Sequence, residues 1–196
     1  NKITSEDKDK MEWAMNDLQL SRKLYLYDHW GSLDEDNLMA RLRFLAKGLD
    51  CDFIVLDHIS IVVSGLDTAD ERRTIDVLMT KLRSFVQESK VGLIIISHLK
   101  KPFGKGYEEG AQTSINSLRG SASIAQISDN VIGLERDQQG EDPDLVTVRI
   151  LKNRLSGETG VACHLRYNRE TGRLREVDPE LQKVFDQGES QNAIDF

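Results

Sequence analysis

The sequence predicts an α/β fold, in which a mostly parallel sheet is flanked by helices and followed by a C-terminal β-hairpin and a flexible tail. Two apolar runs, at 53–56 and 91–96, are short and rich in β-branched residues, which is typical of strands buried on both faces of a parallel sheet. The segment between them carries one apolar stripe at helical spacing. A strand, a helix and a strand in this order indicate a parallel pair joined by a covering helix.

The region before the first apolar run predicts two helices and one short strand. Residues 5–18 alternate apolar and charged positions at helical spacing, with Ser5 as the expected N-cap. Residues 24–27 have the pattern of a short strand. A second helix is expected to begin at Ser32 or Asp34, because leucines then recur at helical spacing.

The region after the first apolar run supplies the remaining elements and suggests how the chain is divided. The expected elements are a helix from 67–70 to 86, a Gly- and Lys-rich loop at 99–110, a weakly helical segment at 116–127, strands at 131–135 and 145–151, and a hairpin of 163–167 with 173–177. We expect three regions: a helical lead-in at 1–20, a core at 21–178, and a flexible polar tail at 179–196.

Composition limits the class of protein. The chain has 196 residues, of which 39% are hydrophobic and 30% charged, so it can form a folded domain with a core. Its net charge of −7 argues against a generic nucleic-acid binder, and any such contact must come from local basic loops. Cys51 and Cys163 have neither metal-site nor disulfide spacing, which fits a reducing intracellular setting. No membrane contact is expected, because no apolar run has the length of a span.

Polar residues follow both apolar strands. Asp57 follows the first strand and His98 the second, so both should lie at one edge of the sheet, about 5 Å apart between strands. Open α/β folds bind ligands at this edge, where a carboxylate can hold the magnesium of a triphosphate. An imidazole there can contact the terminal phosphate or steer a water. A turn-capping Asp and a His that merely ends a strand are the alternatives.

Cationic loops are the second candidate feature. Lys100 and Lys105 lie in a flexible Gly-containing loop, and Arg119 precedes a further glycine, which suits phosphate contact without base readout. Arg154 lies just past a strand, where it can reach a neighbouring subunit's triphosphate as an arginine finger. Ordinary solvated surface cations are the alternative for each of these residues.

One expected motif of nucleotide hydrolases is missing from the sequence. No segment matches G-x-x-x-x-G-K-[ST], the loop whose amides hold the phosphates. We therefore expect a polypeptide limited to these residues to lack hydrolysis by itself.

Five short motifs occur in a fixed order along the chain. They are IVLDHISIVV at 54–63, IISHLK at 95–100, SLRGSA at 117–122 with QISD at 126–129, LERDQQG at 134–140, and ILKNR at 150–154. This series closely resembles the DnaB-like family of hexameric replicative helicases, and within it the helicase domains of bacteriophage primase–helicases. The resemblance covers nearly the whole chain. It implies a RecA-like core that couples hydrolysis of ATP or a dNTP, with Mg²⁺, to translocation on single-stranded DNA and unwinding of duplex DNA at the replication fork.

The resemblance also implies roles for residues around the triphosphate. Asp57 matches the family's acid that positions magnesium, and His98 matches the sensor of the γ-phosphate. Gln126 matches the polar sensor glutamine. Arg154 matches the arginine finger that acts across the subunit interface of the ring, with Lys152 beside it.

Further roles concern the base and the DNA. Arg136 and Tyr167 match the pair that sandwiches the nucleotide base, a stacking site that tolerates different bases. Lys100, Lys105 and Arg119 fall in the segments that line the central channel and hold single-stranded DNA.

The resemblance has consequences for partners as well. Asp195 and Phe196 end the chain like the tail that docks such helicases onto the replicative polymerase. Other helicase subunits are the implied partners in a ring, and the cytoplasm of an infected bacterial cell is the implied location.

The sequence also departs from the family pattern and leaves rival interpretations. The family's phosphate-binding loop and catalytic glutamate are not found in it, and Ala125 stands where a cation is expected. One rival is a RecA-like recombination ATPase or a circadian-type ATPase. The other is a non-catalytic helicase fragment that acts in ring assembly or polymerase binding.

Overall fold

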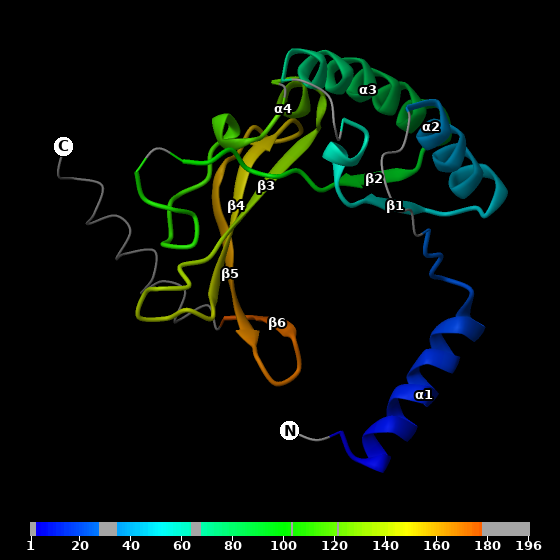
Figure 1. The fold of residues 1–196 in the computed structure, drawn as a ribbon, viewed down its shortest axis with the longest axis vertical. Coiled ribbons are helices and arrows are strands. Elements are labelled where there is room, and N and C mark those ends of the chain that lie inside the picture. The colour runs from blue at the N-terminus through cyan, green and yellow to red at the C-terminus, as the bar shows by residue number, and fades with distance from the viewer. Residues whose placement is uncertain (1–2, 28–34, 64–67, 103, 121, 178–196) are drawn as a thin grey trace. The chain divides into compact units, whose positions relative to one another are not determined.

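The structure is a computed structural model that describes residues 3–27, 35–63, 68–102, 104–120 and 122–177 (Figure 1). The chain divides into two compact units, Asn1–Gly31 and Ser32–Phe196. The first unit contains α1 (Ser5–Ser21). The second contains, in order, α2 (Glu35–Arg43), a π-helical turn (Phe44–Gly48), β1 (Phe53–Leu56), a 3₁₀ turn (Ile59–Ile61), α3 (Thr68–Ser89), β2 (Gly92–Ile95), a 3₁₀ turn (Ile115–Ser117), α4 (Ser123–Ile127), β3 (Asn130–Glu135), β4 (Leu145–Asn153), β5 (Gly160–Asn168) and β6 (Arg173–Glu176).

The helix α1 begins one residue earlier than the sequence suggested. Its N-cap is Thr4, whose Oγ1 accepts a hydrogen bond from the Asp7 amide at 3.2 Å, while Asp7 Oδ2 accepts one from the Thr4 amide at 2.9 Å. This reciprocal capping box satisfies two otherwise free amides, so the prediction of Ser5 as N-cap is wrong. The predicted strand at 24–27 is also wrong, because the described part of this unit offers no second strand to pair with it.

Strands β1 and β2 form a parallel pair, as the sequence predicted. The register runs from Phe53↔Gly92 to Leu56↔Ile95. The connection between the strands contains α3, which lies with α2 over one face of the pair (Figure 1). The side chains of Ile75, Leu78 and Leu82 on α3 are at most 1% exposed and form the centre of the core. Apolar burial beneath α3 therefore fixes the crossover and the parallel direction.

The opposite face of this pair is exposed in the described chain. Phe53 is 73% exposed, Val55 61% and Ile94 51%, whereas Ile54 is 6% exposed. The prediction that these strands are buried on both faces is therefore wrong here. The cause is that the described helices of this unit cover only the Ile54 side.

The other strands form a separate antiparallel sheet in the order β3-β4-β5-β6. Short turns connect its successive strands, and short connections favour antiparallel pairing. The predicted strands at 131–135 and 145–151 and the terminal hairpin are confirmed; β3, β4 and β5 are longer than expected, and β6 ends one residue earlier, at Glu176. The α/β class is confirmed as well, although the described strands comprise one parallel pair and one larger antiparallel sheet, so β3 does not extend the parallel pair.

Several predicted features lie outside the described residues. They include the helix starts at Ser32 or Asp34 and the tail at 179–196 with Asp195 and Phe196. Across the ranges that the structure does describe, no helix combines the length and apolarity needed to cross a lipid bilayer.

The core beneath α3 generates a stability prediction. We expect Leu78→Ala to lower the free energy of unfolding by about 2–5 kcal/mol, because the fully buried side chain leaves a cavity. Urea unfolding followed by circular dichroism measures this loss. The neighbouring Val77 is 44% exposed, so Val77→Ala should change stability by less than about 0.5 kcal/mol. Equal losses in the two variants would contradict the assigned packing.

Candidate functional site

The ends of β1 and β2 bring two predicted site residues to one edge. Asp57 follows β1 and His98 lies three residues after β2, and both residues are exposed. Pairing continues past the strands, because the Ile96 amide donates to Leu56 O at 2.9 Å and the Ile59 amide donates to Ile96 O at 3.0 Å. The backbone therefore holds both residues at the carboxyl edge of the parallel pair, where this class of sheet binds ligands.

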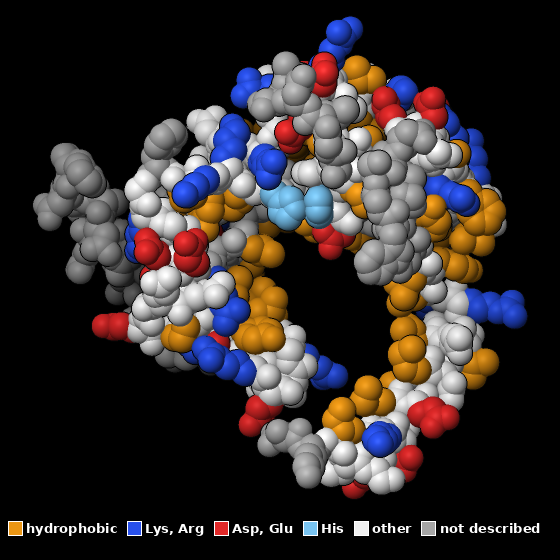
Figure 2. All heavy atoms as spheres, viewed as in Figure 1, with side chains coloured by type: hydrophobic (Ala, Val, Ile, Leu, Met, Phe, Trp, Pro, Cys, Tyr) orange, Lys and Arg blue, Asp and Glu red, His pale blue; other side chains and the backbone are white. Residues whose placement is uncertain are grey.

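A second histidine packs against His98, and the sequence analysis did not single it out. The rings of His58 and His98 have centroids 4.1 Å apart and are tilted by 60°. His58 Nδ1 is buried and has no hydrogen-bond partner among the described residues. Figure 2 shows histidine side chains side by side on the visible face, with lysine and arginine side chains nearby. The sequence signal that could have identified His58 as a site residue is its position directly after Asp57.

The donor set at this edge fits magnesium bound to a phosphate better than a metal held by protein alone. No group of three or more His, Cys, Asp or Glu that could hold a metal occurs in the described ranges. Asp57 offers one exposed carboxylate. Magnesium usually keeps several waters and takes one or two protein carboxylates together with substrate phosphates. A single exposed acid therefore suffices for that kind of site.

The end of α4 gathers three more predicted residues. Lys152 Nζ donates to Ala125 O at 2.6 Å and to Gln126 O at 2.9 Å, and Arg154 Nη2 donates to Gln126 O at 3.0 Å. Cations at the C-terminal carbonyls of a helix satisfy these acceptors and favour the helix end electrostatically. Lys152 thus brings a charge to Ala125, the position at which the sequence analysis expected a cation.

An ion-pair chain connects this cluster to α3. Asp129 Oδ1 lies 3.1 Å from Arg154 Nη1, and Asp129 Oδ2 accepts a hydrogen bond from Arg83 Nη1 at 2.6 Å. Arg83 carried no signal of this contact in the sequence, because its partner lies 46 positions away. The Arg154 side chain is 47% exposed, so these contacts orient the guanidinium while leaving it accessible from outside.

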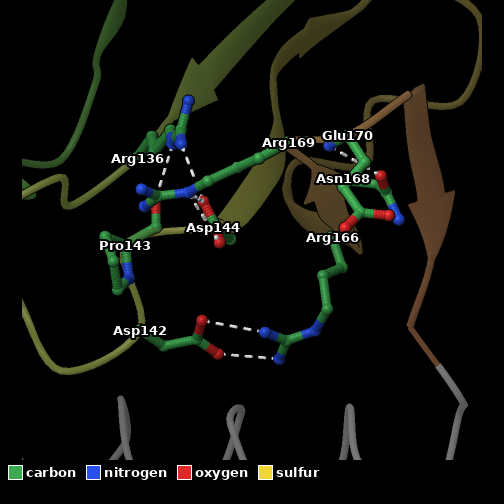
Figure 3. A network of polar contacts seen from close by, with 8 residues as sticks. All are labelled: Arg136, Asp142, Pro143, Asp144, Arg166, Asn168, Arg169 and Glu170. Atoms are coloured by element: carbon green, nitrogen blue, oxygen red, sulfur yellow. Dashed lines mark hydrogen bonds and ion pairs between the residues drawn. The ribbon is translucent and has the colours of Figure 1, made fainter. Parts of the chain in front are cut away.

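The pair predicted to hold a base is also brought together. The guanidinium carbon of Arg136 lies 5.0 Å from the centre of the Tyr167 ring. Arg136 Nε donates to Pro143 O at 2.6 Å, and its Nη2 donates to Asp144 Oδ1 at 3.1 Å (Figure 3). A base between the two groups needs about 7 Å, two van der Waals separations, so Arg136 must swing away to admit one.

Two of the three predicted DNA-contacting cations belong to segments tied to the His98 backbone. The Arg119 amide donates to His98 O, and the Lys100 amide donates to Ser117 O, both at 2.8 Å. Both cations are exposed, and Arg119 Nε lies 3.8 Å from a Glu71 carboxylate oxygen. Backbone hydrogen bonds therefore join the segment after His98 to the segment that carries Arg119.

The third of these cations, Lys105, lies near the antiparallel sheet. Its Nζ is 3.9 Å from Asp137 Oδ2, and Lys105 is exposed. The same loop is fixed to the sheet by the Gln138 amide, which donates to Glu108 O at 2.9 Å. The structure therefore does not bring Lys105 into the His98 backbone network that holds Lys100 and Arg119.

An ion pair next to the Arg136 contacts perturbs an acid. Arg166 donates to both carboxylate oxygens of Asp142, at 2.8 and 2.7 Å (Figure 3). These hydrogen bonds from the guanidinium lower the pKa of Asp142 below its ordinary value, and they raise the pKa of Arg166. The pair stabilises the turn between β3 and β4 against the terminal hairpin.

Sequence comparison finds relatives of the chain. Residues 1–176 match the family described as DnaB-like helicase C-terminal domain. A DNA helicase/primase of Enterobacteria phage T3 is 49% identical over 174 residues, which cover 88% of this chain and 31% of that protein. The chain thus spans about a third of the length of that relative.

Structural comparison identifies similar folds. One solved structure, described as an ATPase domain, matches with a TM-score of 0.70 at 21% identity, covering 89% of this chain and 62% of that one. A DnaB-like replicative helicase, studied for its interactions with primase, matches with a TM-score of 0.69 at 20% identity, covering 91% and 44%. A KaiC-like protein of Pyrococcus horikoshii matches with a TM-score of 0.60 at 16% identity, covering 91% and 72%. These likenesses show a RecA-like ATPase fold.

The Arg166–Asp142 pair yields a pH prediction. Because the pKa of Asp142 is lower in the folded chain, the pair adds stability above the unfolded pKa and loses it as pH falls through the folded pKa, in the range below about pH 4. We expect Arg166→Leu to raise the pKa of Asp142 toward its ordinary value in an NMR titration of the carboxyl carbon. Since both side chains are partly exposed, the stability change at neutral pH should stay below about 1 kcal/mol.

The control for this titration is Arg173→Leu, which removes an equal charge from the same hairpin without touching the hydrogen bonds of Asp142. An unchanged Asp142 pKa in Arg166→Leu, or the same change in both variants, would contradict the assigned cause.

Proposed function

The chain belongs to the family of DnaB-like helicase C-terminal domains, and from this premise we propose that it is the C-terminal part of the motor of a replicative DNA helicase. The motor hydrolyses ATP or a dNTP, moves along single-stranded DNA as a ring hexamer and unwinds duplex DNA at the fork. The observation that carries this proposal is the parallel pairing of β1 and β2, which sets Asp57 and His98 at one edge.

At this edge the two residues have complementary tasks. The Asp57 carboxylate holds the hydrated metal of the substrate, and His98 donates a hydrogen bond to the terminal phosphate or orients the attacking water. Magnesium, when bound, neutralises charge on the phosphate oxygens. After phosphate leaves, His98 loses its contact, and its backbone hydrogen bond to Arg119 supports transfer of this change to the DNA-holding segments.

The cluster at the end of α4 serves the neighbouring subunit's nucleotide. Gln126 senses the phosphate, and Arg154 reaches across the subunit interface to stabilise charge in the transition state, with Lys152 beside it. The exposure of Arg154 supports this role, because the contacts with Asp129 leave about half of the side chain accessible. To reach a phosphate, the guanidinium exchanges Asp129 for the incoming anion.

Base binding and DNA binding use separate groups. Arg136 and Tyr167 hold the nucleotide base, since their stacked arrangement opens to accept a flat ring. Lys100, Lys105 and Arg119 contact DNA phosphates, which gives binding without sequence preference. Local cations of this kind are compatible with the net charge of −7, because only the channel-lining segments need be basic.

The wider organisation follows from the same family membership. We propose that residues 1–20 form a helical lead-in, 21–178 the C-terminal portion of a RecA-like core, and 179–196 a flexible tail, in which Asp195 and Phe196 dock on the replicative polymerase. The phage origin of the relative supports action in the cytoplasm of an infected bacterial cell. A polypeptide limited to these 196 residues lacks hydrolysis, because its sequence contains no phosphate-holding loop.

An activity measurement tests this function. In the intact protein that contains these residues, we expect Asp57→Asn to lower the kcat of DNA-stimulated nucleotide hydrolysis on the order of 10²-fold or more, the effect of losing one preorganised electrostatic group. The control is Asp52→Asn, an exposed acid at the other end of β1, which should leave kcat within about twofold. Comparable activity in wild type and Asp57→Asn would refute the proposal, and hydrolysis by the 196-residue polypeptide alone would refute the claim that it is incomplete.

A further inference from the structure

One cavity, formed at the end of the antiparallel sheet by the β3–β4 connection and β5 with its following turn, combines stacking surfaces with polar groups. It has a volume of about 480 Å³ and is lined by Arg136, Gln138, Pro143, Tyr167 and Arg169. The Tyr167 ring and Pro143 offer apolar surface, while the other three side chains carry hydrogen-bonding groups. A flat heterocycle with a polar edge is the kind of ligand that such a lining suits.

Both arginines of this cavity are already engaged by the chain itself. Arg136 donates to Pro143 O and to Asp144, and Arg169 Nε lies 2.8 and 3.1 Å from the two oxygens of Asp144 (Figure 3). One carboxylate therefore orients and partly neutralises two guanidiniums. Stacking on Arg136 and Tyr167 involves the faces of a base, and every base has such a face, so stacking alone does not distinguish bases.

Gln138 contributes an amide side chain to the lining, whose other uncharged hydrogen-bonding group is the Tyr167 hydroxyl. Its side-chain amide makes no hydrogen bond with any residue in the described ranges. Its backbone is fixed, because its amide donates to Glu108 O at 2.9 Å and Asp137 Oδ1 accepts from the next amide, that of Gln139, at 3.0 Å. A fixed turn thus presents an uncommitted amide to the cavity.

A primary amide matches the chemistry of base edges. It carries one acceptor oxygen and two N–H donors, so it pairs with edges that present both kinds of group and discriminates between bases that present different patterns. We propose that Gln138 reads the hydrogen-bonding edge of the bound base and sets the nucleotide preference of the motor. This inference rests on the proposed function and adds to it a specificity-determining residue outside the predicted Arg136–Tyr167 pair.

The test compares two neighbouring glutamines. In the intact protein that contains these residues, kcat/KM is measured with dATP, dCTP, dGTP and dTTP in the presence of single-stranded DNA. In the wild type, we expect kcat/KM to differ by at least about fivefold between the best and the worst nucleotide. In Gln138→Leu, we expect this difference in kcat/KM to fall to within about twofold, mainly through changes in KM. Gln139→Leu is the matched control, because Gln139 is an exposed amide that does not line the cavity, and it should keep the wild-type spread.

A second variant checks the chemistry independently of any loss of packing. Gln138→Glu keeps the shape but only accepts hydrogen bonds, so it should shift preference toward dATP, dCTP and dGTP, whose bases carry donating amino groups, and away from dTTP, whose base has none. An unchanged spread in Gln138→Leu, a uniform fall for all four nucleotides, or a wild type that does not discriminate would overturn the inference while leaving the proposed function in place. A wild-type protein that turns over no nucleotide would overturn both.

Discussion

The parallel pairing of β1 and β2 determines both how the core packs and which polar residues lie at the sheet edge. Side chains alternate between the two faces of a strand, so a slip of one residue would move Ile54 out of the core and separate Asp57 from His98. The buried stripe of α3 opposes this slip, because Ile75 and its neighbours pack in one apolar cluster with Ile54 and would lose that burial. The register of two short strands thereby determines which polar groups meet at the sheet edge.

The helix α3 also joins this edge to the second cluster of candidate site residues. Its Arg83 holds Asp129, which in turn holds Arg154, so the orientation of Arg154 depends on the placement of α3. The segment that precedes α4 also approaches α3 closely at Gly120. Gly120 has φ +101°, and a Cβ there would lie 2.7 Å from Ile75 Cδ1, so this position favours glycine. Residues that act on different nucleotides under the proposed function are therefore linked through one rigid helix within a subunit.

The sequence was sufficient to predict the local elements and insufficient to predict how they are covered. Apolar runs and helical spacing identified β1, β2 and α3, because these signals depend on neighbouring residues alone. Exposure of the Phe53 side of β1 was missed, since a strand pattern does not state what packs against it. The Arg136–Tyr167 contact was anticipated only through family resemblance, because it depends on the pairing of distant strands. Gln138 and His58 carried no periodic signal at all.

Under the proposed function, each nucleotide site is divided between two subunits, with the Asp57 edge on one and Arg154 on the next. Intact protein carrying Arg154→Ala is mixed with wild type at increasing ratios, and DNA-stimulated hydrolysis is measured, with Arg173→Ala as the control arginine from an exposed strand. A finger that acts across the interface predicts that activity falls faster than the wild-type fraction, because one altered subunit disables its neighbour's site. A loss strictly proportional to the fraction of Arg154→Ala subunits would contradict the action of Arg154 across the subunit interface.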